Sequence, residues 1–221
     1  MLRGVIFDID GTLVDSNDAH AQSWVDTFGE FGYDVPFDAV RPLIGMGGDK
    51  LLPKAIGVDS DSEEGKKLSE RRSEIFRERY LPRLRAFDGS RELVLRIRAD
   101  DLKAIVATSA KDEELKGLLK AAQVADLMEE KATASDAQRS KPDPDIVHAA
   151  IRESGISPRQ LVMIGDTPYD VEAAGRAGVR IIGFRCGGWT DEELKGAVEI
   201  YDGPAHLLER YPSSLIGSAG K

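Results

Sequence analysis

Residues 2–12 of the chain read Leu2-Arg3-Gly4-Val5-Ile6-Phe7-Asp8-Ile9-Asp10-Gly11-Thr12. The first six are nearly continuous in apolar character, which is typical of a strand buried on both faces of a parallel sheet. Asp8 and Asp10 then follow the strand, at the edge where open parallel sheets bind their ligands. Asp10-Gly11 is also a common turn dipeptide, so a plain chain reversal is the simpler alternative. Two carboxylates that leave one strand end repel each other, however, and a bound cation would remove the conflict, with Mg²⁺ favoured by an all-oxygen set.

The rest of the chain alternates short apolar runs with helix-period segments. Strands are predicted at 102–107, 161–164 and 179–184, with a weaker edge strand at 198–201. Helices are predicted at 91–99, 113–122, 146–153 and 169–177. This alternation predicts an α/β fold with a doubly wound, parallel, Rossmann-like sheet as its core.

Residues 16–82 break the alternation. They contain no convincing strand, and amphipathic helix patterns cover 17–31 and 63–80. We therefore predict an inserted α-helical cap domain at 16–82, and a core domain made of 1–15 and 83–221.

Composition narrows the function classes. The 221 residues include 30 Lys and Arg against 39 Asp and Glu, a net charge of −9. The acidic balance argues against nucleic acid as a partner, and no apolar run approaches the ~20 residues that span a membrane. The N-terminal segment predicts a strand and no cleavable signal, and the single Cys186 fits a reducing compartment. Together these features predict a cytoplasmic protein.

Other predicted strand ends also carry polar groups. Thr108-Ser109 offers hydroxyl and backbone donors to an anion, and Lys141 precedes a helix that Asp143-Pro144 would start. The segment Gly165-Asp166-Thr167-Pro168-Tyr169-Asp170 adds two more carboxylates. Each piece alone is an ordinary loop sequence. Their convergence on one edge of one sheet predicts a shared site.

The order D-x-D-G-T, T-S, K-P and G-D-x-x-x-D resembles the haloacid dehalogenase-like phosphohydrolases over nearly the whole chain, and the helical insertion resembles that superfamily's cap. The resemblance implies that Asp8 is the nucleophile, phosphorylated during turnover. It implies that Asp10 is the general acid and base. Thr108, supported by Ser109, would bind a phosphoryl oxygen, and Lys141 would offset negative charge.

The same resemblance implies a Mg²⁺ ion held by Asp8, the backbone carbonyl of Asp10, and Asp166, with Asp170 in a supporting role. The electrostatics agree with it. Four carboxylates face one lysine, and two like charges 4 Å apart repel by about 4 kcal/mol at an effective dielectric of ~20. A phosphate could not readily approach without a divalent ion.

The cap would decide the substrate. Residues 44–50, Ile44-Gly45-Met46-Gly47-Gly48-Asp49-Lys50, resemble the glycine-rich cap segment of the phosphoglycolate phosphatase branch. Gly45 would let the backbone approach a small phosphorylated metabolite, and Lys50 or Arg41 would meet its carboxylate. The alternative is a loop that only opens a helix.

His20 resembles a histidine that assists the general acid in β-phosphoglucomutase, although a histidine on a helix face often serves only as a hydrogen-bond partner. The mutase alternative is disfavoured, because the cap lacks the mutase arginine and the last motif is Gly165-Asp166 with Asp170. A phospho-accepting receiver domain and a catalytically silent scaffold are the more distant alternatives. The leading prediction is a phosphatase acting on a small phosphomonoester, as a monomer or homodimer.

Overall fold

The computed structural model describes residues 1–128 and 130–220. Within them, six strands form one parallel sheet in the order β3-β2-β1-β4-β5-β6. The strands are β1 (Gly4–Phe7), β2 (Lys103–Ala107), β3 (Glu130–Ala132), β4 (Leu161–Gly165), β5 (Arg180–Phe184) and β6 (Glu199–Tyr201). The predicted fold class is confirmed. The sequence did not indicate β3, whose three residues include two charged ones.

β1 lies in the middle of the sheet. Ile6 is in register with Ile105 of β2 on one side and Met163 of β4 on the other. All four residues of β1 are buried, which explains the continuous apolar run. Val5 and Phe7 belong to the core on one face of the sheet, and Ile6 belongs to the core on the other.

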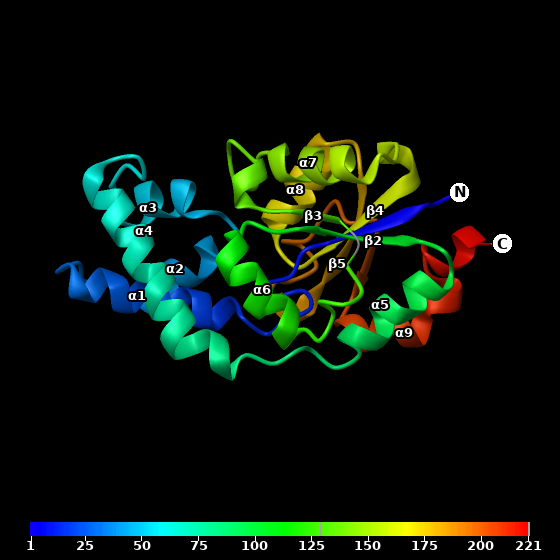
Figure 1. Cartoon of the computed structure of the whole chain (residues 1–221), viewed down its shortest axis with the longest axis horizontal. Helices are drawn as coiled ribbons and strands as arrows, with labels where there is room; N and C mark the ends of the chain where they lie inside the picture. The colour runs from blue at the N-terminus through cyan, green and yellow to red at the C-terminus, as the bar shows by residue number, and fades with distance from the viewer. Residues whose placement is uncertain (129, 221) are drawn as a thin grey trace.

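Helices cover both faces, as Figure 1 shows. Residues of α5, α6 and α9 pack in the same core cluster as Val5 and Phe7, and residues of α7 and α8 pack in the cluster of Ile6. The bounds are α5 (Ser90–Ala99), α6 (Asp112–Ala121), α7 (Asp145–Ser154), α8 (Pro168–Arg176) and α9 (Pro204–Arg210). None of the described helices is both long and apolar enough to cross a membrane.

The segment between β1 and α5 is helical, as expected, and has its own small core around Trp24, Phe28 and Leu68. Its α-helices are α1 (Asn17–Glu30), α2 (Phe37–Val40), α3 (Gly48–Ile56) and α4 (Glu63–Ile75). Figure 1 shows these helices grouped at one end of the molecule, away from both chain termini. We call the helical part of this segment, residues 17–80, the cap; the domain boundaries at 15/16 and 82/83 stay a prediction.

One helix start differs from the expectation. α7 begins at Asp145, and Pro144 occupies the N-cap position that Asp143 was expected to take. The reason is tertiary, because the Asp143 carboxylate forms an ion pair with Lys50 of the cap instead. A side chain held by a remote partner is not free to cap its own helix.

Candidate active site

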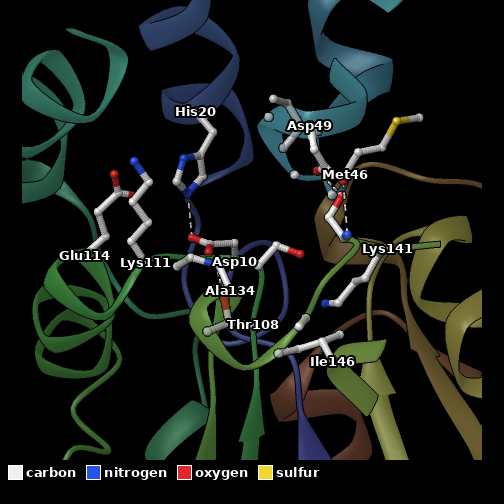
Figure 2. Close-up of a pocket in the computed structure, with 18 of the residues that line it drawn as sticks. Asp10, His20, Met46, Asp49, Thr108, Lys111, Glu114, Ala134, Lys141 and Ile146 are labelled. Carbon is white, nitrogen blue, oxygen red and sulfur yellow. Dashed lines mark hydrogen bonds and ion pairs between the residues drawn. The ribbon is translucent and has the colours of Figure 1, made fainter. Parts of the chain in front are cut away.

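The polar residues predicted at the strand ends meet beneath the cap. Asp8 directly follows β1, Thr108 follows β2 and Asp166 follows β4, and these three strands are neighbours in the sheet. A cavity of about 330 Å³ lies between this edge and the cap, lined by residues of both. Figure 2 shows His20 pointing from the cap to Asp10, with Thr108 and Lys141 entering from the core.

Lys141 is the cation of the site and is only 2% exposed. Its Nζ lies 2.6 Å from Asp8 Oδ1 and 2.7 Å from Asp170 Oδ1. Burial alone would lower the pKa of Lys141, but the charges of Asp170 and Asp8 outweigh it and raise that pKa. Lys141 is therefore a fixed positive charge, and its burial is tolerable only because both carboxylates pair with it.

The neighbours of Asp8 carry more negative than positive charge. Burial raises its pKa well above the ordinary value; Lys141 lowers it, and the charges of Asp170, Asp166 and Asp10 raise it further. One lysine thus does not compensate the whole group of carboxylates. A second cation would restore Asp8 to the ionised form that a nucleophile needs.

Asp8, Asp166 and Asp170 could hold such a cation. One carboxylate oxygen from each lies within 4.8 Å of the others, and all three residues are buried. Burial and the charge of Asp170 raise the pKa of Asp166 to about 7. An all-oxygen donor set fits Mg²⁺. The third expected ligand is the backbone carbonyl of Asp10, which stays a prediction; the Asp10 carboxylate faces His20 and is not part of this group.

The Asp166 carboxylate lies in a close-fitting cradle. Thr12 Oγ1 donates to its Oδ1 and Asn17 Nδ2 to its Oδ2, both at 2.8 Å. A Cβ on Gly11 or Gly187 would overlap Oδ2, so only glycine fits at these two positions. Sequence reasoning missed these roles. Thr12 lies inside the D-x-D-G-T motif, whereas Asn17 carries no local signal.

Asp170 is held by the first turn of α8. Thr167 donates to its Oδ2 from the hydroxyl at 2.6 Å and from the backbone N–H at 3.1 Å, while the Asp170 N–H donates back to the Thr167 hydroxyl. This capping box leaves Oδ1 directed at Lys141. Asp170 thus holds the Lys141 ammonium group in position through an ion pair.

Asp10 contacts the cap. Its Oδ1 lies 2.7 Å from His20 Nε2 and accepts a hydrogen bond from Ser16 Oγ at 2.6 Å. Burial would raise the pKa of Asp10, but His20, Ser16 and Arg72 together outweigh burial and hold it below the ordinary value. Asp10 is therefore ionised at neutral pH in the absence of further charges.

Arg72 of α4 extends this contact to the core. It contacts His20 Nδ1, lies 4.8 Å over the Phe76 ring, and donates to both carboxylate oxygens of Glu114 in α6, at 3.1 and 3.0 Å. The Glu114 side chain is 3% exposed. A buried ion pair thus links cap and core beside Asp10. Sequence reasoning missed Arg72 and Glu114, because both belong to ordinary amphipathic helix patterns.

Thr108 and Ser109 both line the cavity. Thr108 Oγ1 accepts a hydrogen bond from the Ala110 N–H at 3.1 Å, which fixes the turn after β2. Ser109 Oγ is buried and has no hydrogen-bond partner among the described residues. Buried hydroxyls normally have a hydrogen-bond partner, so the Ser109 hydroxyl is available to hydrogen-bond a ligand in the cavity.

The predicted cap residues divide into two groups. Gly45 lines the cavity, and its φ of +108° favours glycine. Lys50 and Arg41 do not line it: Lys50 pairs with Asp143, and Arg41 donates to the Gly187 carbonyl at 2.7 Å. Both cations therefore hold the cap on the core. Contact of either one with a substrate stays a prediction.

Comparisons with known proteins agree with this geometry. A haloacid dehalogenase-like hydrolase family model matches residues 5–184. Phosphoglycolate phosphatase of Caulobacter vibrioides is 30% identical, over 86% of this chain and 82% of that one. The chain is also 33% identical to Protein SUPPRESSOR OF QUENCHING 1, chloroplastic, of Arabidopsis thaliana. That match covers 83% of this chain but only 18% of the much longer plant protein.

Among solved structures, a hydrolase from Pseudomonas syringae is 28% identical. It superposes with a TM-score of 0.89, over 96% of this chain and 99% of that one. The match in sequence and the match in overall structure therefore indicate the same family. This chain belongs to the haloacid dehalogenase-like hydrolase family.

Proposed function

We propose that this protein is a Mg²⁺-dependent phosphatase that hydrolyses a small phosphomonoester through a phosphorylated Asp8. The observation that carries the proposal is the buried Asp8, which lines the cavity, lies 2.6 Å from Lys141 and is grouped with Asp166. Phosphoryl transfer to a carboxylate needs a positioned nucleophile and concentrated positive charge. Phosphoglycolate is the first substrate to test, because the C. vibrioides relative is a phosphoglycolate phosphatase.

In the first step an Asp8 oxygen attacks phosphorus, and the bond from phosphorus to the substrate's ester oxygen breaks. Lys141 stabilises the negative charge on Asp8 and on the phosphoryl oxygens. The hydroxyls of Thr108 and Ser109 donate to those oxygens. A Mg²⁺ ion held by Asp8, Asp166 and the backbone carbonyl of Asp10 supplies charge neutralisation when bound.

Asp10 acts as the general acid and then as the general base. It protonates the departing ester oxygen, and in the second step it takes a proton from the water that attacks the aspartyl phosphate. Inorganic phosphate leaves and the Asp8 carboxylate is restored. Because the pKa of Asp10 is lowered, the carboxylate is in the ionised form that accepts a proton in the second step. For the first step, the negative charge of the arriving phosphate raises that pKa, so Asp10 takes up a proton from water before it donates one. The proton gained in the second step restores the acid for the next turnover, and His20 keeps the carboxyl group in place.

The test is phosphate release from a panel of phosphomonoesters, with and without Mg²⁺. We expect Mg²⁺-dependent release, and a fall in kcat of at least about 10³-fold for Asp8→Asn, which retains the shape of the side chain without its nucleophilic charge. Asp18→Asn is the matched control, because that carboxylate is 77% exposed and pairs with Arg41. No release from any substrate, or an active Asp8→Asn, would reject the proposal.

The same assay separates the alternatives. A sugar-phosphate mutase would isomerise its substrate after priming by a bisphosphate, with little net phosphate release. A receiver domain would retain its aspartyl phosphate instead of turning over. Receivers also have the strand order 2-1-3-4-5, which differs from the order β3-β2-β1-β4-β5-β6 of this sheet.

A further inference from the structure

Asn17 joins the cap to the carboxylate group. It is the first residue of α1 and is 3% exposed. Its Nδ2 donates to Asp166 Oδ2 at 2.8 Å and to the Gly187 carbonyl at 3.1 Å. The Gly187 carbonyl can only accept, so it requires that the Nδ2 end of the amide faces Gly187 and Asp166.

The other end of the same amide lacks a partner. Asn17 Oδ1 is buried and has no hydrogen-bond partner among the described residues. Buried amide oxygens are normally satisfied by protein, by water or by a ligand. The amide also packs closely on Gly11, where a Cβ would overlap Nδ2. The side chain is therefore held tightly, and its Oδ1 is an acceptor without a partner among the described residues.

We propose that Asn17 is a positioning residue for the divalent ion: it orients the Asp166 carboxylate for binding and leaves Oδ1 as an acceptor for the hydrated ion. The inference rests on the metal site of the proposed function. Residues that hydrogen-bond metal ligands typically contribute a factor of about 10–100 to metal affinity. Because Asn17 opens α1, the same two hydrogen bonds tie the first cap helix to the metal site.

The test is calorimetric titration of the full-length protein with Mg²⁺ in the absence of substrate. We expect Asn17→Ala to raise the Mg²⁺ Kd by about 10–100-fold, while circular dichroism shows an unchanged fold. If the alanine variant does not fold, Asn17→Leu retains the side-chain volume and removes both hydrogen bonds.

Gln22→Ala is the matched control. Gln22 lies on the same helix, and its Nε2 donates to a carboxylate outside the site, Asp26 Oδ1, at 3.0 Å. We expect no change in Mg²⁺ affinity for this variant. An unchanged Kd for folded Asn17→Ala, or an equal loss in Gln22→Ala, would overturn the inference.

The outcome is independent of hydrolysis. A wild-type protein that binds Mg²⁺ but releases no phosphate would refute the proposed function, while an altered Kd in Asn17→Ala would still support the inference. An active wild type with an unaltered Kd in Asn17→Ala would refute the inference alone. A wild type that binds no Mg²⁺ would refute both.

Discussion

The two sides of the cavity are built differently. On the core side, Asp8, Thr108 and Asp166 stand directly after neighbouring strands, so the register of the sheet places them. On the cap side, Arg72 and Lys50 reach the core from helices through long side chains that end in ion pairs. Backbone hydrogen bonds hold a strand end rigidly, whereas an ion pair between flexible side chains can open. We therefore expect the core to govern chemistry and stability, and the cap to govern closure over the substrate.

The largest effect is expected for Lys141→Met, on the core side. It leaves Asp8 and Asp170 buried without their cation, and breaking a buried ion pair typically costs about 3–5 kcal/mol. Urea unfolding measures this loss, and phosphate release should fall to background. Lys54→Met is the control, because Lys54 is exposed on the cap. Unfolding of Lys141→Met at the wild-type urea concentration would contradict the comparison.

An intermediate effect is expected for Glu114→Gln, which removes the charge that pairs with Arg72 beside His20. We expect kcat/KM to fall about 10–100-fold, equivalent to about 1.4–2.7 kcal/mol, because Arg72 would no longer hold His20 against Asp10. Steady-state kinetics with the best substrate measures it.

The neighbouring glutamate supplies a matched control for that variant. Glu113 also pairs with a cap arginine, Arg77, but its side chain is 75% exposed, and exposed pairs contribute roughly 0–1 kcal/mol. Glu113→Gln should thus stay close to wild type. Equal losses in the two variants would mean that burial of the pair is irrelevant.

The smallest effect is expected for Lys50→Met, whose ion pair with Asp143 is only partly buried. We expect a loss of about fivefold or less in kcat/KM, equivalent to about 1 kcal/mol, measured by steady-state kinetics. A selective rise in KM for substrates that carry a carboxylate, such as phosphoglycolate, would instead support the substrate contact that the sequence indicated.

Sequence reasoning worked best where the structure is local. The apolar run of β1 and the motif residues after it were recognisable, because a doubly covered strand needs consecutive apolar residues and the site lies at its end. β3 escaped notice, since its sequence Glu130-Lys131-Ala132 has no strand pattern and is defined only by pairing with β2. The prediction that Asp143 is the N-cap residue of α7 was wrong. The start of this helix too depends on a distant contact, because Lys50 of the cap binds the Asp143 carboxylate.

The sequence by itself determined the α/β class, the helical insertion and the residues that carry the proposed chemistry. These depend on periodicity and on motifs a few residues long. Only the tertiary structure decided which side chains hold those residues in place. Asn17 meets Asp166 across 149 positions, and Arg72 meets Glu114 across 42. Such contacts follow from how the cap packs on the sheet, and neither helix carries a local pattern that distinguishes these residues from ordinary surface positions.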